Sequence, residues 1–538
     1  MRVYSGVAAN TGIAIGSILV YQREQQEIER YQVDEVEDEL KRFEEAKAKT
    51  IEKLKELYQK ASSRAGEESA MIFEVHQMLL DDPEYCNSVI GMIREESWNA
   101  EYAVKQTAEN ISNIFLAMEN DYFRERATDI LDVSKRVIAV LTGREEAIIT
   151  TEEPVILLAD DLVPSETVQL DKNMILGFVT QQGSINSHTA ILSRTMDIPA
   201  MIGVEIPLED LDGVMAAIDA EEGKFYINPD IKTVALLKKK HQIEIERKEL
   251  LKELKGKETI TKSGKKINLF ANIGSIDDVD KVITYDGEGI GLFRSEFLYL
   301  ENHHFPTEEE QYQAYKTVVK KMKGKKVIIR TMDLGADKQA NYFNLGHEEN
   351  PALGYRAIRI CLDRPELLKT QLRAILRASA FGLVSVMIPM IISLEEVQKV
   401  KEILEEVKLE LRKEKVSFSE IELGIMIETP AAVLISDILA KEVDFFSIGT
   451  NDLTQYTLAI DRQNQKLDKI YQPHHLALLR MIEMTIKNAH DNKIWVGICG
   501  ELASDQVMTE TFLHMGVDEL SVSPNKVLEI RNIIRNTP

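Results

Sequence analysis

The chain of 538 residues is too long for a single hydrophobic core, and its length predicts three or four domains. A formal net charge of −24 argues against a nucleic-acid-binding protein, although solubility alone is a sufficient explanation for it. Three cysteines in so long a chain exclude a disulfide framework and indicate a reducing compartment, and no apolar run is long enough to span a bilayer. We therefore expect a cytoplasmic protein.

The first 143 residues combine a short strand-like segment with a long helical one. Residues 1–21 alternate apolar and small residues without a basic start, which predicts strands and not a signal peptide. Residues 22–143 predict a helical domain, and its first helix, at 33–58, has coiled-coil character because apolar residues recur at spacings of three and four. Further helices are expected at 70–80, 87–95, 100–118 and 127–141.

Short apolar runs begin after Pro154 and predict a small α/β domain. Its strands are expected at 155–159, 174–179, 213–218 and 224–227. The strands of 1–21 lack a core of their own, so we expect them to complete this domain. It would then consist of 1–21 plus 144–230, and the helical domain would be an insertion.

His188 lies in the same domain, where a small polar turn meets an amphipathic run and a helix should begin. Free backbone N–H groups and the positive end of the helix dipole would face a group attached to its ring. A neutral imidazole can act as a nucleophile, so His188 is a candidate phosphoryl carrier. A lone histidine is more often a capping or core residue than a phosphoryl carrier. Motifs elsewhere in the chain are needed to distinguish these two interpretations.

The C-terminal half predicts a (β/α)8 barrel over 263–538, preceded by a charged helical linker at 231–262. Eight short apolar runs alternate with helical patterns, which is typical of parallel βαβ units. The expected strands are 268–273, 289–293, 326–329, 385–390, 422–427, 445–448, 495–498 and 519–522.

Polar side chains directly after these runs predict an active site, because such barrels carry it at the carboxyl ends of their strands. Arginines bind phosphate and carboxylate oxygens, carboxylates bind Mg²⁺, and a thiol can move a proton. The candidates are Arg294, Arg330, Glu428, Asp452, Arg462 and Cys499. Judged alone, Cys499 could equally be a buried structural cysteine.

Several long motifs, in order along essentially the whole chain, give it a family resemblance. The chain resembles enzyme I of the bacterial sugar phosphotransferase system, the phosphoenolpyruvate–protein phosphotransferase family. The motifs are 160–167, Ser187-His188-Thr189-Ala190-Ile191, 198–200, 291–298, 350–359 and Ser447 to Tyr456, of which the last is the most specific.

The resemblance implies a role for each matching residue. His188 would be phosphorylated with Thr167 near its ring, and Cys499 would protonate the enolate as pyruvate forms. Phosphoenolpyruvate would be bound by Arg294, Arg330, Asn451, Asp452 and Arg462, with Arg356 assisting. Glu428 and Asp452 would hold Mg²⁺. The helical domain would dock the carrier protein HPr through segments that contain Glu67, Glu68, His76 and Arg126, and the barrel would form a homodimer.

The chain departs from the family pattern at four positions. Ser184 and Asn186 replace a glycine and a hydroxyl residue in the histidine loop, Ala336 replaces part of a Gly-Gly pair, and Gln463 replaces a glycine. These changes make the rate of phosphoryl transfer and the preference for a carrier protein less certain than the type of reaction.

Two other functions remain open at this stage. A phosphoenolpyruvate synthase or pyruvate phosphate dikinase would need an ATP-binding domain ahead of the histidine, where the chain is mostly helical and has no glycine-rich phosphate loop. A non-catalytic regulatory protein could keep the fold, because fold alone does not imply activity. It would be indicated by loss of any one of His188, Arg294, Glu428, Asp452 or Cys499, and none is lost.

Overall fold

A computed structural model provides the structure of the chain, which divides into two compact units, Met1–Glu246 and Arg247–Pro538. The structure describes all residues except 23–27, 66, 117–120, 145–150, 152, 163–165, 167–169, 172–173, 184–189, 191–192, 194–197, 301, 303, 336–340, 344, 347, 463, 465–466 and 468–469. It also leaves out the side chains at 60, 62–65, 67–70, 121–125, 248 and 341.

The first unit contains an eight-stranded mixed sheet in the order β1-β8-β7-β3-β4-β5-β6-β2. Its strands are β1 (Arg2–Ser5), β2 (Val7–Asn10), β3 (Ile13–Tyr21), β4 (Val155–Ala159), β5 (Ile175–Thr180), β6 (Ala200–Ile202), β7 (Met215–Asp219) and β8 (Lys224–Ile227). β3 pairs in parallel with β4, in a register that sets Ser17 opposite Val155. The N-terminal strands therefore lie in the same sheet as the strands that begin at residue 155.

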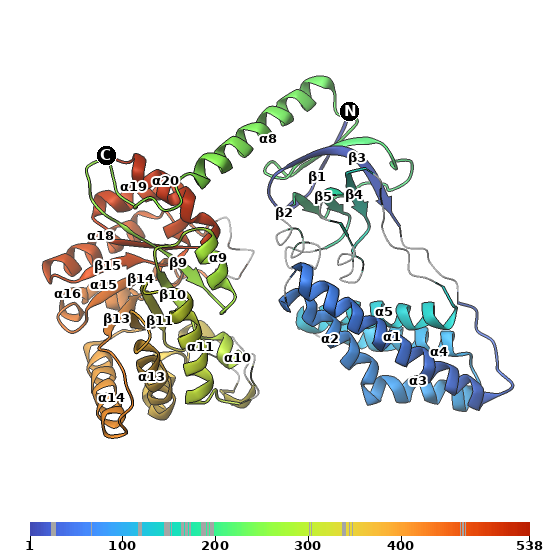
Figure 1. Ribbon diagram of the computed structural model, residues 1–538, viewed down its shortest axis with the longest axis horizontal. Coiled ribbons are helices and arrows are strands. Elements are labelled where there is room, and N and C mark those ends of the chain that lie inside the picture. The colour runs from blue at the N-terminus through green and yellow to red at the C-terminus, as the bar shows by residue number, and fades with distance from the viewer. Residues whose placement is uncertain are drawn as a thin grey trace. The chain divides into compact units, whose positions relative to one another are not determined.

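Among the described residues between β3 and β4 the chain forms five helices (Figure 1): α1 (Val36–Ala65), α2 (Glu67–Asp81), α3 (Pro83–Glu96), α4 (Ala100–Leu116) and α5 (Asp121–Leu141). Their apolar faces form one core, in which Phe43, Leu54 and Val104 are fully buried. The start of α3 follows from its sequence. The Asp82 carboxylate accepts the free N–H groups of the first turn, and proline at the next position needs no partner for its nitrogen.

The second unit is a closed barrel of parallel strands in the order β10-β11-β12-β13-β14-β15-β16-β9. The strands are β9 (Asn268–Ile273), β10 (Ile290–Arg294), β11 (Val327–Arg330), β12 (Val384–Ile388), β13 (Glu422–Ile427), β14 (Phe445–Ile448), β15 (Trp495–Ile498) and β16 (Glu519–Val522). Every strand predicted for this half is present, and the fold class is confirmed.

Helices surround the barrel, and α8 (Ile231–Lys252) precedes it (Figure 1). They are α9 (Asp278–Thr284), α10 (Phe297–Leu300), α11 (Glu308–Lys321), α12 (Ile358–Asp363), α13 (Pro365–Ser379), α14 (Leu394–Lys413), α15 (Pro430–Leu434), α16 (Ser436–Leu439), α17 (Thr450–Leu458), α18 (Leu476–Asp491), α19 (Gln506–Met515) and α20 (Val527–Asn536). Short 3₁₀ turns occur at Asn341–Phe343, Pro351–Leu353, Glu501–Ser504 and Pro524–Lys526.

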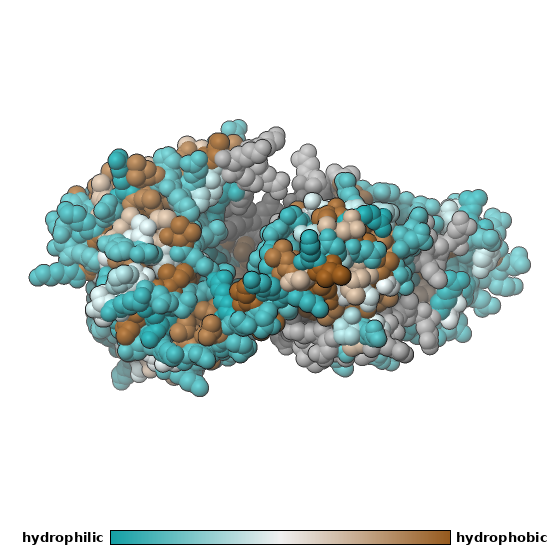
Figure 2. All heavy atoms as spheres, turned by 90° about the horizontal axis from the view of Figure 1, so that it is seen from above, coloured by the Kyte–Doolittle hydropathy of each residue, from teal (hydrophilic) through white to brown (hydrophobic). Residues whose placement is uncertain are grey.

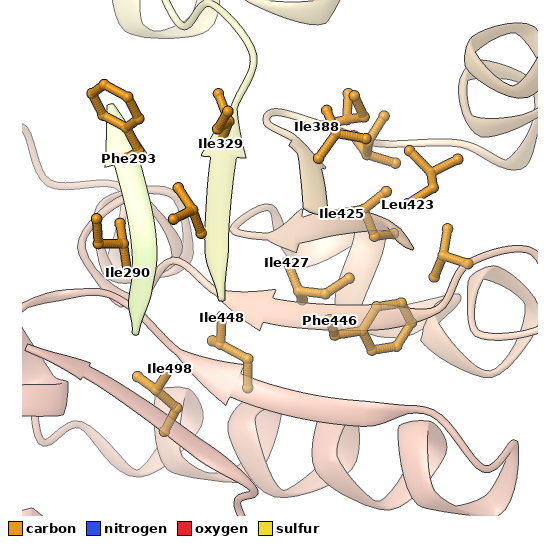
Figure 3. Packing of buried hydrophobic residues seen from close by; sticks show 14 of the residues in the cluster. Ile290, Phe293, Ile329, Ile388, Leu423, Ile425, Ile427, Phe446, Ile448 and Ile498 are labelled. Carbon is orange, nitrogen blue, oxygen red and sulfur yellow. The ribbon is translucent and has the colours of Figure 1, made fainter. Parts of the chain in front are cut away.

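Successive side chains of a barrel strand point alternately to the helices and to the barrel interior. On β13, Ile425 and Ile427 belong to the large cluster that packs between the strands and the helices (Figure 3), whereas Met426 belongs to the smaller cluster inside the barrel. This alternation continues past the strand ends, and it determines which of the following residues enter the barrel mouth.

None of the described helices is long and apolar enough to cross a membrane. The face of the molecule in Figure 2 is largely hydrophilic, with hydrophobic residues in separate groups.

Candidate active site

The strand period brings three of the predicted site residues to the inside of the barrel. Arg330 stands two residues after Ile328, which lies in the interior cluster. Glu428 follows Met426 and Cys499 follows Gly497 at the same interval of two. All three side chains are at least nine-tenths buried, and Glu428 interacts electrostatically with both Arg330 and Cys499, so the carboxyl ends of β11, β13 and β15 meet in one charged, buried centre.

Arg330 is held by carboxylates on two sides. Its guanidinium lies 3.0 Å from Glu296 Oε1 and 3.2 Å from Asp333 Oδ2. Asp333 also binds Arg356, with 2.7 Å between Oδ1 and Nη2. Burial opposes the charge of Arg330, but the carboxylates around it more than offset this and raise its pKa. The Arg330 guanidinium is therefore charged, and its N–H donors are fixed in direction before any substrate binds.

Glu296 and Asp333 were not among the predicted site residues. Both stand close after a strand that ends in arginine, β10 for Glu296 and β11 for Asp333. That spacing was visible in the sequence. The pairing across strands, in which Glu296 binds Arg330 of the neighbouring strand, depends on the barrel register and was not visible.

Glu428 combines full burial with an unsatisfied oxygen. Its Oε1 accepts the N–H of Met390 at 2.6 Å, whereas Oε2 accepts no hydrogen bond from any described residue. Burial, then the negative charges of Asp452 and Asp333, raise the pKa of the Glu428 carboxyl. A buried oxygen without a partner costs free energy, which a bound cation would recover.

The donors at this position fit a divalent cation. Asp452 lies in the first turn of α17 and acts on Glu428 as a like charge, so a metal would relieve the repulsion between the two carboxylates. Among the described residues no group of three or more His, Cys, Asp or Glu could hold a metal. Two carboxylates alone would leave several coordination positions for substrate oxygens or water.

Cys499 is buried beside these charges, and burial raises the pKa of its thiol to about 12. Ser447 lowers that pKa by a smaller amount, and Glu519 and Glu428 raise it further. The thiol therefore keeps its proton at neutral pH. It suits a proton donor and not a thiolate nucleophile.

Arg294, Arg462 and Asn451 complete the predicted substrate-binding set. The pKa of the Arg294 guanidinium is lowered by desolvation and then by the positive charge of Arg330, with a smaller contribution from Arg462. Such mutual repulsion between cations favours an anionic ligand. Asn451 exchanges two hydrogen bonds with Glu501: its amide donates at 3.1 Å and it accepts the Glu501 N–H at 2.9 Å. Glu501 is a further neighbour of the site that sequence reasoning did not assign.

The remaining predicted residues belong to the first unit. His188 and Thr167 lie outside the described residues, as do the side chains of Glu67 and Glu68. His76 is fully buried, with Nε2 3.5 Å from Asp129 Oδ1, and so presents no surface for direct contact with a carrier. Arg126 is partly exposed and lies 2.9 Å from Asp129.

Models of the phosphoenolpyruvate-utilising enzymes match three parts of the chain. The N-terminal model covers residues 5–126, the mobile-domain model 151–223, and the model of the phosphoenolpyruvate-binding domain 248–538. The last of these spans more than half of the chain and contains the charged centre described above.

Curated relatives match along almost the whole chain. The phosphoenolpyruvate-protein phosphotransferase of Priestia megaterium is 43% identical over 535 residues, which cover 98% of this chain and 93% of the relative. Those of Bacillus subtilis and Staphylococcus carnosus are 42% and 41% identical, each over 99% of this chain, and over 94% and 93% of their own lengths. The chain therefore belongs to the phosphoenolpyruvate-utilising enzymes and, within them, to the phosphoenolpyruvate-protein phosphotransferase family.

Proposed function

We propose that this chain transfers the phosphoryl group of phosphoenolpyruvate to His188 and from there to a histidine of the carrier protein HPr, releasing pyruvate. This is the first step of the sugar phosphotransferase system. The observation that carries the proposal is the barrel mouth, where a guanidinium fixed by Glu296 and Asp333 lies near the unsatisfied carboxylate of Glu428.

The arginines bind the substrate anion. Arg294, Arg330 and Arg462 pair with its phosphate and carboxylate oxygens, while Asn451 and Arg356 assist. Because Glu296 and Asp333 already orient Arg330, little reorganisation accompanies binding or the development of charge in the transition state. Positioning and charge neutralisation are the main contributions that an enzyme can make to phosphoryl transfer.

Phosphoenolpyruvate-utilising enzymes need a divalent metal, and we propose Mg²⁺ here, held by Glu428 and Asp452. When bound, the cation neutralises charge on the phosphate and enolate oxygens. The residues of the chain carry out the remaining chemistry. A ring nitrogen of His188 attacks phosphorus while the bond to the enol oxygen breaks, and the buried thiol of Cys499 gives its proton to C3 of the enolate.

His188 then offers the phosphoryl group to the carrier. Thr167 lies near its ring in this proposal, and Glu67, Glu68 and Arg126 belong to the carrier-docking segments, with His76 supporting them from the core. Phosphoenolpyruvate and HPr are the implied partners. The homodimer through the barrel and the cytoplasmic location stay predictions.

Transfer of label tests the proposal. The purified protein is incubated with ³²P-labelled phosphoenolpyruvate and Mg²⁺, and we expect acid-labile label on His188 that moves to added HPr. The matched control is His241→Ala, which removes an exposed histidine of α8 and should label like the wild type. An unlabelled wild type, or full labelling of His188→Ala, would refute the proposal. A requirement for ATP would favour the synthase instead.

A further inference from the structure

A tyrosine of α17, Tyr456, contacts two loops of the barrel mouth, and the proposed mechanism gives it no task. It lies four residues after Asp452, so the two side chains leave the same face of the helix, one turn apart. Its hydroxyl donates a hydrogen bond to Ala352 O at 2.6 Å and lies 3.9 Å from Met390 Sδ. Burial raises the pKa of this hydroxyl to about 12, so it keeps its proton and acts as a donor.

The hydrogen bond to Ala352 reaches the segment that carries Arg356, residues 350–357, which we call the Arg356 loop. Ala352 is the middle residue of the 3₁₀ turn Pro351–Leu353 in this loop. The Arg359 guanidinium donates to two carbonyl oxygens at the end of the turn, at 2.9 and 2.6 Å, and so ties the turn to α12. Because the turn is held as a unit, a bond that fixes Ala352 also fixes the backbone four residues before Arg356.

The backbone directly after Arg356 is strained. Ala357 has a φ of 50° and a ψ of −127°, a conformation that a residue with a side chain keeps only where its surroundings impose it. Ala357 is fully buried, and its N–H donates to Leu334 O at 3.0 Å. This contact fixes the loop after Arg356, and the hydroxyl of Tyr456 fixes it before Arg356.

The position of the Arg356 backbone matters because its side chain shares a carboxylate with Arg330. Nε and Nη2 of Arg356 donate to Asp333 Oδ1, at 3.2 and 2.7 Å, and the residue is buried. The other oxygen of Asp333 lies 3.2 Å from the Arg330 guanidinium. A displaced Arg356 loop would therefore disturb a carboxylate that orients two proposed substrate-binding arginines.

The second contact of the Tyr456 hydroxyl leads to Glu428. Met390, whose sulfur lies 3.9 Å from the hydroxyl, donates its N–H to Glu428 Oε1 at 2.6 Å. One side chain of α17 thus touches both the Arg356 loop and the residue that binds the Glu428 carboxylate, while Asp452 stands one turn earlier on the same helix.

We propose that Tyr456 is a positioning residue that holds the Arg356 loop in place for phosphoenolpyruvate, through the hydrogen bond from its hydroxyl to Ala352 O. This inference rests on the proposed function. Tyr456 acts on the substrate through the backbone of the loop and not by direct contact. Without the hydroxyl the aromatic ring still fills its space, but the turn loses a partner and Arg356 pairs less well with the substrate anion.

Binding of phosphoenolpyruvate to a full chain that cannot accept its phosphoryl group tests this role. Titration calorimetry with Mg²⁺ compares the His188→Ala parent with the same chain carrying Tyr456→Phe. We expect Kd to rise about three- to tenfold, the effect of one lost hydrogen bond. In the chain that retains His188, KM should rise by a similar factor while kcat changes less than twofold, because the hydroxyl positions a residue that binds the substrate.

Two further variants separate positioning from a general loss of structure. In an Arg356→Met background, which lacks the guanidinium, Tyr456→Phe should change Kd less than twofold. Tyr85→Phe, which removes a buried hydroxyl 2.9 Å from Ser134 Oγ in the first unit, should bind as the parent does. An unchanged Kd in Tyr456→Phe, full additivity with Arg356→Met, or an equal loss in Tyr85→Phe overturns the inference. A parent chain that binds no phosphoenolpyruvate refutes the proposed function itself.

Discussion

The chain buries two thiols in its barrel unit, those of Cys499 and Cys361, and burial raises the pKa of each to about 12. Their surroundings differ. Cys499 belongs to the cluster inside the barrel, whereas Cys361 lies in α12 and packs in the cluster between strands and helices. The same chemical group thus lies inside the barrel at one position and between the strands and the helices at the other.

Replacing each cysteine by alanine should separate chemistry from packing. Cys499→Ala removes the proposed proton donor, so we expect kcat for pyruvate formation to fall by about 10²–10⁴-fold. The affinity for phosphoenolpyruvate should stay within twofold, because the neutral thiol contributes no charge to anion binding. Pyruvate release coupled to lactate dehydrogenase and titration calorimetry measure the two quantities. Cys361→Ala is the control and should keep kcat; a loss shared by both variants would contradict the role of Cys499.

The positions of site residues could be predicted wherever they follow from the two-residue period of a strand. Arg330, Glu428 and Cys499 continue the inward-facing positions of their strands, so their meeting in one centre follows once the strands are known. The contacts that orient them could not be predicted. Glu296 binds Arg330 and Glu501 binds Asn451 across separate strand ends, and such pairs depend on register and loop path.

At the scale of elements, the loop between β12 and α14 supports Glu428. Met390 donates its N–H to the carboxylate while its backbone has a φ of 60°, a conformation that costs a non-glycine residue free energy. Three residues later α14 begins with a capping box: Ser393 Oγ accepts the Glu396 N–H at 3.3 Å, and Glu396 accepts the Ser393 N–H at 3.2 Å. The cap fixes one end of the strained loop.

Removal of this cap should affect both stability and metal dependence. Ser393→Ala should lower the free energy of unfolding of the barrel by about 1 kcal/mol. It should also raise the Mg²⁺ concentration for half-maximal rate, by less than the ~10–100-fold expected for loss of a direct partner of a metal ligand. Thr307→Ala removes the equivalent cap of α11, which does not lead to Glu428. Urea unfolding should show the same loss in both variants; an equal Mg²⁺ response would refute the link to Met390.

Sequence patterns predicted the presence of strands more reliably than the residues at which the strands begin and end. Five of the barrel strands have the predicted bounds, for example Glu422–Ile427, because apolar runs there stop at clear polar or glycine residues. β10 and β11 extend one residue further, through Arg294 and Arg330, since an arginine can stay in the strand ladder while its side chain turns inward. β6 has only three residues, too few to give a period, and was missed.

At the scale of the whole molecule, His188 and the barrel site belong to different compact units, so the proposed transfer depends on the segment of chain that joins the two units. The position of the boundary between linker and barrel therefore matters. Residues 254–262 were assigned to the linker from sequence, yet Leu254 O and Thr259 Oγ1 accept hydrogen bonds from Arg531, at 3.2 and 3.0 Å. Lys262 N–H also donates to Thr537 O at 2.8 Å. This segment is attached to the barrel and not free to bend.

Two fragments should therefore differ in stability. A fragment of residues 247–538 keeps the partners of Arg531, and we expect it to unfold cooperatively on heating. A fragment of residues 263–538 leaves part of this fully buried guanidinium without acceptors, at a cost of about 1–3 kcal/mol for each lost charged hydrogen bond. Calorimetry should show a Tm several degrees lower for the fragment 263–538 than for the fragment 247–538. Arg531→Met in the longer fragment should lower its Tm and so bring it closer to that of the shorter fragment. Equal Tm values for the two fragments would mean that 254–262 belongs to the linker after all.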